Sequence, residues 1–298
     1  MNTIPIIDTH QHLWDLDQLS LPWLKEAPLL NKNHRISDYL LAIKDCNIET
    51  SIYMEVDVSP NLRTKEREVI SNLCARNEIV TKAAVFGATP GNPDFKKILQ
   101  SLSENKYAKG ARLVLQSPDK EPGTCLNKDF LTDVRSLGSH NLLFDVCIRP
   151  AELSDAAELA SKCPETTLVL DHCGNADPNI VSGKTDISAT STYQHDRETW
   201  LNNMKKISDY PNVICKISGI VARAKPNWNP DDLAPTVNHC INCFEEDRVI
   251  FGSDWPVCTT TAALFEWTNA LRTIVSSRSD QFQRKFFHEN AKRIYSIE

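Results

Sequence analysis

The sequence lacks the features that mark several large protein classes. No apolar run approaches the roughly 20 residues that a membrane-spanning helix requires. The opening residues, MNTIPIID, have a short apolar stretch and no basic residue, so they do not predict a secretory signal. Lysine and arginine are dispersed in a chain of net charge −6, which argues against nucleic-acid binding. We expect a cytoplasmic enzyme with a small-molecule substrate, no nucleic-acid partner and no membrane partner, and leave homo-oligomerisation open.

Motifs for nucleotide and structural-zinc binding are also missing. No G-x-G-x-x-G follows the first apolar run, no G-x-x-x-x-G-K-[ST] occurs, and no internal repeat is visible. Cys240 and Cys243 form the one C-x-x-C pair among ten cysteines, without a second pair at zinc-finger spacing. The pair falls in a helix-like segment, so we interpret both cysteines as structural. A chain of this length without a secretory signal does not need a disulfide framework.

What the chain does contain is a regular alternation of strand-like and helix-like segments. Short runs rich in β-branched residues predict eight buried parallel strands: Ile4–Ile7, Ser51–Val56, Lys82–Phe86, Gly110–Val114, Leu142–Ile148, Thr167–Leu170, Val213–Ile217 and Arg248–Phe251. Between them we predict helices at 65–77, 92–105, 128–141, 151–164, 197–210 and 231–247. This alternation over about 250 residues indicates an α/β fold, a (β/α)8 TIM barrel, with residues 1–298 as one domain.

Polar residues stand at the carboxyl ends of these strands, where a TIM barrel carries its active site. His10 and His12 share one face of an extended segment, because side chains alternate along it. His172 follows the sixth strand and Asp254 follows the eighth. Singly, each has an ordinary explanation as a core histidine or a turn residue. Together, three imidazoles and a carboxylate predict a mononuclear metal site, with zinc as a suitable ion.

Other residues near strand ends are candidates for substrate binding. Arg112 in the fourth strand has a planar guanidinium that suits a carboxylate or a developing negative charge, with a structural salt bridge as the alternative. Glu55 ends the second strand, and Lys216 lies towards the end of the seventh, where it could contact substrate oxygens or pair with a carboxylate. Three tryptophans flank the site in sequence, as apolar walls or as packing: Trp14, Trp23 and Trp255.

Several motifs, in order along the chain, resemble those of the amidohydrolase superfamily. They are IDTHQHLWD, PWL, GARLVLQ, FDVCIRPAEL, LVLDHCGNAD, PNVICKISG and RVIFGSDWPVC. The resemblance is to the amidohydrolase-2 family and its branch of L-fuconolactonase-like sugar-lactone hydrolases, and it runs nearly end to end. It implies a barrel with its site at the C-terminal mouth and site residues at His10, His12, His172 and Asp254.

The chain departs from the binuclear members of that superfamily at two positions. Those members have a bridging lysine on the fourth strand and a histidine after the fifth. Here Arg112 stands in GARLVLQ and Asp145 stands in LLFDVCIRP. The resemblance therefore implies at most one divalent ion, with zinc favoured, and leaves open a site that requires no metal.

The resemblance also implies a reaction, the hydrolysis of a small lactone in carbohydrate metabolism. Asp254 would act as general base towards water, while the three histidines, directly or through zinc, and Arg112 would polarise the carbonyl. The alternatives are a zinc-dependent decarboxylase acting on an unsaturated or aromatic acid, and a barrel that binds a ligand without catalysis. The sequence does not identify the substrate, because specificity depends on three loops: Leu16–Arg35, Gly174–His195 and Val221–Asp232.

Overall fold

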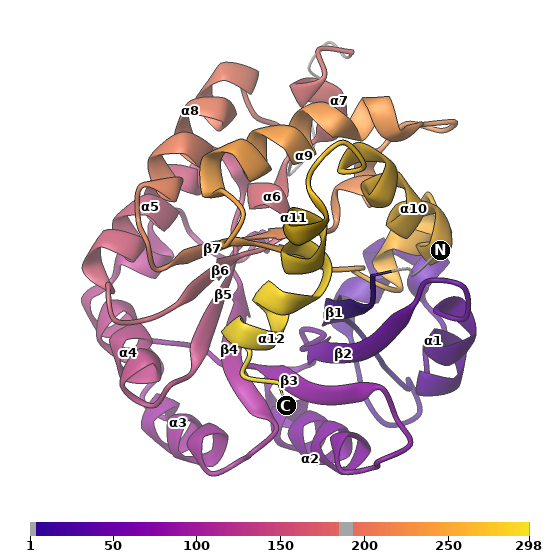
Figure 1. The fold of residues 1–298 in the computed structure, drawn as a ribbon. Coiled ribbons are helices and arrows are strands. Elements are labelled where there is room, and N and C mark those ends of the chain that lie inside the picture. The colour runs from indigo at the N-terminus through magenta and orange to yellow at the C-terminus, as the bar shows by residue number, and fades with distance from the viewer. Residues whose placement is uncertain (1–3, 185–192, 298) are drawn as a thin grey trace.

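The computed structural model describes residues 4–184 and 193–297. Eight parallel strands, adjacent in chain order, form a barrel surrounded by helices (Figure 1). The strands are β1 (Ile6–Gln11), β2 (Ile48–Met54), β3 (Thr81–Gly87), β4 (Ala108–Val114), β5 (Leu143–Cys147), β6 (Leu168–Leu170), β7 (Val213–Ile217) and β8 (Val249–Phe251). The predicted TIM barrel is confirmed, and every predicted strand overlaps an observed one.

The first strand is longer than predicted and contains the first metal-site candidate. The sequence placed its end at Ile7, because the following residues, DTHQ, are polar. In the structure it continues to Gln11, so His10 lies inside β1 rather than after it. The buried polar groups have partners. The Asp8 carboxylate accepts hydrogen bonds from the Tyr39 hydroxyl and the Ser253 backbone N–H, both at 2.7 Å. Polar residues are tolerated in a buried strand when they are hydrogen-bonded.

The helices confirm the six segments predicted and add others. The confirmed ones are α2 (Arg63–Cys74), α3 (Phe95–Ser103), α4 (Lys128–Ser139), α5 (Leu153–Lys162), α8 (Arg197–Ser208) and α9 (Pro230–Phe244). The helices not predicted are α1 (Ile36–Ala42), α6 (His172–Asn175), α7 (Pro178–Val181), α10 (Leu264–Ile274), α11 (Asp280–Arg284) and α12 (Asn290–Ile294). Most of the missed helices are only four to seven residues long, so they offer few turns for a hydrophobic period to appear.

Local chemistry fixes where the longer helices begin. The Asp196 side chain accepts a hydrogen bond from the backbone N–H of Thr199 and caps α8. At the start of α9, Asn229 and Asp232 form a reciprocal capping box in front of Pro230. Such caps satisfy backbone N–H groups that have no partner within the helix.

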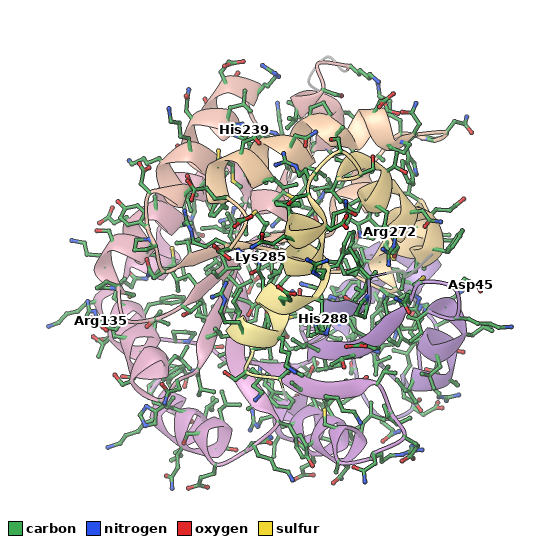
Figure 2. All side chains as sticks on the ribbon, viewed as in Figure 1. Asp45, Arg135, His239, Arg272, Lys285 and His288 are labelled. Carbon is green, nitrogen blue, oxygen red and sulfur yellow. The ribbon has the colours of Figure 1, made fainter. Side chains whose placement is uncertain are left out.

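The core has an inner and an outer part. Apolar side chains such as Ile52, Val85 and Ile250 fill the barrel, where Ala291 and Tyr295 pack against them. These two residues belong to the C-terminal segment around α12, which lies across one end of the barrel in Figure 1. A larger apolar cluster lies between strands and helices. Charged side chains, for example Asp45 and Arg135, project outward from the ring of helices (Figure 2).

The polar segments after β1 and β8 join these two strands. The backbone N–H of Asp254 donates to the carbonyl of His10 at 2.9 Å, and that of His12 donates to the carbonyl of Trp255 at 2.7 Å. The Thr9 hydroxyl donates to the carbonyl of Phe251 at 2.6 Å. The pairing therefore brings His10, His12 and Asp254 together at the carboxyl ends of the strands. Within the described ranges, no helix has the length and apolar character of a membrane span.

Candidate active site

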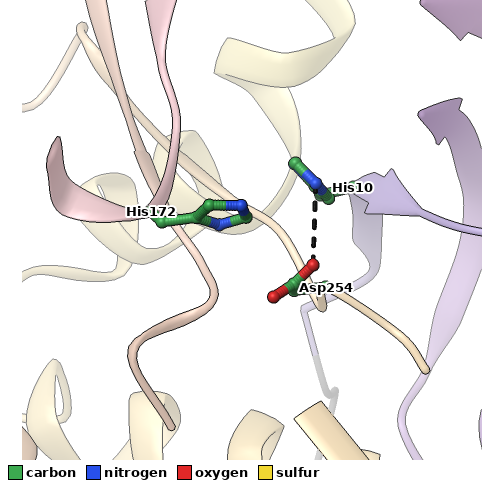
Figure 3. Close-up of side chains that lie close together, drawn as sticks. All are labelled: His10, His172 and Asp254. Carbon is green, nitrogen blue, oxygen red and sulfur yellow. Dashed lines mark ion pairs between the residues drawn. The ribbon is translucent and has the colours of Figure 1, made fainter. Parts of the chain in front are cut away.

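Four residues predicted from separate parts of the sequence meet at the mouth of the barrel. Figure 3 shows His10, His172 and Asp254 pointing towards one another. Asp254 Oδ1 lies 3.6 Å from His10 Nε2 and 3.4 Å from His12 Nε2, and these two nitrogens are 3.2 Å apart. The rings of His10 and His172 have centroids 4.6 Å apart. All four residues are buried.

Unusual backbone conformations present two of these side chains. His172 and Asp254, each close behind a strand, both have a φ of 56°. His172 begins a left-handed turn in which Cys173, Gly174 and Asn175 also have positive φ. Left-handed backbone costs a non-glycine residue roughly 1–2 kcal/mol, and such strain is typical of functional sites.

A glycine next to this turn leaves room for the His172 ring. Gly219 has a φ of +69°, and a Cβ atom at that position would lie 2.4 Å from His172 Nδ1. Any other residue there would therefore displace the imidazole. The Ser218 hydroxyl lies 2.9 Å from the same nitrogen and holds the ring from that side.

The hydrogen bonds around His10 and His12 determine which ring nitrogens face the site. His12 Nδ1 lies 3.0 Å from the carbonyl of Met54, so it carries a proton and donates. His10 Nδ1 lies 3.4 Å from the Asp171 carboxylate and can donate there in the same way. Both Nε2 atoms then present lone pairs to each other. Such a pair is favourable only when a proton or a cation lies near both nitrogens.

The spacing of these atoms fits one tetrahedral ion. Nitrogen and oxygen ligands about 2.0–2.2 Å from zinc lie roughly 3.3–3.6 Å from one another. The separations among His10 Nε2, His12 Nε2 and Asp254 Oδ1 are 3.2 to 3.6 Å. Ligand atoms of His10, His172 and Asp254 also lie within 4.8 Å of one another. The Asp171 contact to His10 resembles the outer carboxylates that orient metal-bound histidines.

The protonation states suit this role. Burial lowers the pKa of His10 well below its usual value and lowers the pKa of His172 to about 4. Burial alone would raise the pKa of Asp254, but the neighbouring imidazoles of His172 and His12 outweigh it, and the net pKa falls below its usual value. At neutral pH the imidazoles of His10 and His172 are therefore neutral and Asp254 is ionised, as metal binding requires.

Arg112 is held by Glu55 in a buried salt bridge. Its Nε donates to Glu55 Oε1, and its Nη2 donates to the Glu55 carbonyl, both at 2.7 Å. Its Nη1 lies 3.4 Å from His10 Nε2 and 3.5 Å from Asp171 Oδ2. The structural salt bridge considered from the sequence is thus present. The guanidinium also reaches the floor of the cavity described below.

Lys216 lies beneath the site and is fully buried. Its Nζ lies 3.0 Å from Asp171 Oδ1 and 2.5 Å from Asp145 Oδ1, and 3.4 Å from His10 Nδ1. The departures from the binuclear pattern therefore have a structural explanation. Arg112 on β4 pairs with Glu55, and Asp145 on β5 pairs with Lys216.

These two buried cations disfavour a second metal ion. Cys147, Asp171 and His172 also have ligand atoms within 4.8 Å of one another. However, Asp171 already lies between the cationic groups of Lys216 and Arg112. Burial further raises the pKa of the Cys147 thiol to about 12, so it is protonated. The described residues fit one ion.

Three of the four residues, His12, His172 and Asp254, line a cavity of about 750 Å³, and the fully buried His10 lies behind them. Its floor includes His12, His172, Asp254 and Arg112. Other lining residues come from the loops predicted to set specificity, including Trp23 and Glu26 from the first, Tyr193 from the second, and Ala222 and Arg223 from the third. Residues 185–192 of the second loop lie outside the described residues.

Four residues predicted to bind substrate lie outside this lining. Glu55 and Lys216 are committed to the ion pairs described above. Trp14 packs against Trp23 and donates from its indole to the carbonyl of Lys32. Trp255 packs against His34 and Tyr39. These positions indicate that the four residues support the site and do not contact the substrate.

Several polar lining residues were not predicted from the sequence, among them Asp57, Gln116 and Arg223. Asp57 and Gln116 lie just beyond β2 and β4. The reasoning from strand ends that identified Glu55 could therefore have identified them too. Arg223 lies in a predicted specificity loop, but nothing in the sequence distinguishes it from a surface arginine.

The fold and the motifs have counterparts in known proteins. A family model described as amidohydrolase matches residues 7–297. An L-fucono-1,5-lactonase of Burkholderia multivorans is 24% identical, over 98% of this chain and 96% of that protein. An L-rhamnono-gamma-lactonase of Scheffersomyces stipitis is 23% identical, over the full length of both.

Solved structures share the architecture. A crystal structure of a Burkholderia multivorans amidohydrolase with bound zinc has a TM-score of 0.83 at 20% identity, over 99% of this chain and 100% of that one. A 2,6-dihydroxybenzoate decarboxylase from Rhizobium has a TM-score of 0.57 at 14% identity, over 99% of each chain. The family match confirms the resemblance seen in the motifs and the prediction of an enzyme: the chain belongs to the amidohydrolase family.

Proposed function

We propose that this protein hydrolyses a small lactone with the help of one divalent ion, zinc by preference. The observation that carries the proposal is the convergence of His10 Nε2, His12 Nε2 and Asp254 Oδ1 where His12 and Asp254 line an open cavity. The cavity volume of about 750 Å³ accommodates a molecule of sugar-lactone size. The two relatives named as sugar lactonases support this reaction class.

In the proposed reaction, Asp254 moves the proton. Its ionised carboxylate accepts a proton from water as the water oxygen attacks the lactone carbonyl. The carbonyl carbon becomes tetrahedral, and its oxygen gains negative charge. When the bond to the ring oxygen breaks, Asp254 returns the proton to that oxygen and the open hydroxy acid leaves.

The groups around Asp254 stabilise the developing negative charge. Arg112 keeps a full positive charge on the cavity floor, and the His172 imidazole lies beside it. Preorganised donors of this kind contribute strongly because they do not reorganise during the reaction. A zinc ion held by His10, His12 and Asp254 would polarise the carbonyl and lower the pKa of bound water.

A substrate panel tests the proposal against decarboxylation, which the decarboxylase-like fold also allows. The protein would be incubated with 1,4- and 1,5-aldonolactones and, separately, with hydroxybenzoates. Acid release would be followed with a pH indicator and CO2 with a coupled assay. We expect acid release from at least one lactone above the spontaneous rate. CO2 from a hydroxybenzoate, with no lactone opened, would overturn the proposal in favour of a decarboxylase.

A further inference from the structure

One side of the cavity carries a carboxylate without a partner. Asp57 follows β2 in a turn with a φ of 49°, lines the cavity and is partly buried. Its backbone N–H donates to Glu55 Oε2 at 2.7 Å, which fixes the turn. Within residues 4–184 and 193–297, no group donates a hydrogen bond to its side chain. Burial, and next the charge of Glu55, raises the pKa of Asp57 to about 6.

Two neighbouring lining residues extend this surface. The indole of Trp23 donates to the carbonyl of Val56 at 2.8 Å, which holds its ring beside the Asp57 turn. Gln116, after β4, has a buried Oε1 that accepts no hydrogen bond from the described part of the chain. An aromatic ring, a carboxylate and an amide oxygen therefore line the same side of the cavity.

The cations of the cavity do not neutralise this surface. The guanidinium of Arg112 already forms two hydrogen bonds with Glu55. Arg223 lies across the barrel, after β7, where it stacks on Tyr193 at 3.8 Å and donates to Asn175. Arg63 and Lys120 also act on the charge of Asp57, but neither lines the cavity: Arg63 donates to the Thr89 hydroxyl, and Lys120 pairs with Asp119. Among the lining residues, a substrate carboxylate on the β2 side would meet Asp57 with no cation nearby except Arg112, which Glu55 already holds. Hydroxyl groups, in contrast, would supply the donors that Asp57 and Gln116 lack.

We propose that Trp23, Asp57 and Gln116 form a hydroxyl-binding subsite that recognises the substrate on the β2 side of the cavity. Two adjacent hydroxyls donate to the two oxygens of Asp57, and a third donates to Gln116 Oε1. The apolar face of the substrate ring packs on Trp23. This inference rests on the proposed lactonase function and assigns the recognition of the substrate to three residues of the same site.

The kinetic test compares Asp57→Asn with the wild type on matched lactones. Asparagine tolerates positive φ and keeps the turn. Its amide carries no charge and has one acceptor oxygen instead of two, so it can accept a hydrogen bond from only one of the two hydroxyls. For a polyhydroxylated aldonolactone we expect KM to rise about 10- to 100-fold, the loss expected for a hydrogen bond to a charged group. We expect kcat to change much less, because Asp57 does not touch the reacting carbonyl.

The deoxy analogues make the test specific. For a lactone that lacks the two adjacent hydroxyls, wild type and Asp57→Asn should have similar KM values. Asp17→Asn, which makes the same change at a side chain that is 80% exposed and outside the cavity lining, is the matched control and should change KM less than threefold. Equal effects of Asp57→Asn on hydroxylated and deoxy lactones would overturn the proposal.

A binding measurement separates this inference from the proposed reaction. A 1,5-anhydroalditol has the hydroxylated ring without the carbonyl, so its affinity does not depend on turnover. Titration calorimetry should show binding that weakens about 10- to 100-fold in Asp57→Asn and in the deoxy anhydroalditol. If wild-type protein binds the anhydroalditol but opens no lactone, the proposed function fails and the subsite stands. If lactones are opened but a carboxylated lactone is preferred over neutral ones, the subsite fails and the function stands.

Discussion

The floor and the β2 side of the cavity differ in whether their polar groups have hydrogen-bond partners within the described protein. On the floor, His10, His12 and His172 each have a neighbour that holds Nδ1, namely Asp171, the Met54 carbonyl and Ser218. On the β2 side, Asp57 and Gln116 present acceptors without donors from the described residues. The floor is therefore organised before a substrate arrives, whereas the β2 side keeps acceptors for the proposed ligand.

Under the proposed function, the difference separates reaction from recognition within one cavity. Groups that must keep their geometry during the reaction are oriented by buried neighbours. Groups that recognise the substrate keep unused hydrogen-bonding capacity, because a site built to bind hydroxyls discriminates through those unpaired acceptors. Changes to the floor should thus affect kcat, and changes to the β2 side should affect KM.

The largest effect is expected from Asp254→Asn. The amide cannot accept a proton, so kcat should fall by about 10²- to 10⁴-fold or more. Initial rates on the best lactone of the panel measure this loss, and circular dichroism melting checks the fold. Asp17→Asn, at a side chain that is 80% exposed, is the control. Unchanged activity in Asp254→Asn would mean that the barrel binds its ligand without this residue's catalysis.

Removal of metal tests whether activity depends on a cation held at the floor. Dialysis against a chelator should abolish activity, and one equivalent of zinc should restore it, because the lone pairs of His10 and His12 then regain their shared cation. Elemental analysis before and after dialysis gives the metal content per chain. Full activity in protein shown to be metal-free would leave the histidines and Arg112 as direct polarisers of the carbonyl.

The buried cation beneath the floor should matter for stability. Lys216→Met leaves Asp145 and Asp171 buried without their ammonium partner, and breaking a buried ion pair costs about 3–5 kcal/mol. Urea unfolding should show this loss in the free energy of unfolding. Adding Asp145→Asn should recover part of it, since one uncompensated charge disappears.

An exposed pair supplies the control for that measurement. Lys97 and Asp94 lie 2.9 Å apart, with side chains 85% and 68% exposed. Lys97→Met should therefore change the free energy of unfolding by less than about 1 kcal/mol. If Lys216→Met is equally mild, the buried cluster contributes little to stability.

The smallest effect concerns a carboxyl group behind the β2 side of the cavity. Glu66 accepts hydrogen bonds from the Tyr53 hydroxyl and the Val56 N–H. Burial, and next the charge of Glu55, raises its pKa from 4.5 to about 7. Between these values the folded state binds more protons than the unfolded state, so the free energy of unfolding falls as pH rises. The loss is at most about 3 kcal/mol.

Glu66→Gln isolates this contribution. Glutamine keeps an oxygen for both hydrogen bonds and does not ionise in this range. Urea unfolding gives the free energy of unfolding of wild type and variant at each pH. The difference between the two should therefore change steadily from pH 4.5 to 7 and stay constant below pH 4.5. A constant difference across the whole range would show that Glu66 does not titrate abnormally.

The sequence predicted the barrel because buried parallel strands and amphipathic helices each have a recognisable period. It predicted His10, His12, His172 and Asp254 because strand ends meet at one mouth of a barrel. It did not predict which ionic groups pair. The pairing of Arg112 with Glu55, and of Lys216 with Asp145, depends on the directions in which side chains point from different strands of the barrel. The role of Asp57 depends on a turn whose left-handed residue the sequence does not mark.

The left-handed turn that begins at His172 limits how this enzyme can be made more heat-resistant. Relief of strained backbone can stabilise a protein, but here the strained residues hold the His172 imidazole in the candidate site. Under the proposed function, relief would therefore trade activity for stability. The outer surface offers safer positions. Leu41 on α1 is 75% exposed, and a polar replacement there removes apolar surface from water far from the cavity. Thermostabilisation of this barrel should therefore begin at its helices and leave residues 172–175 and 219 unchanged.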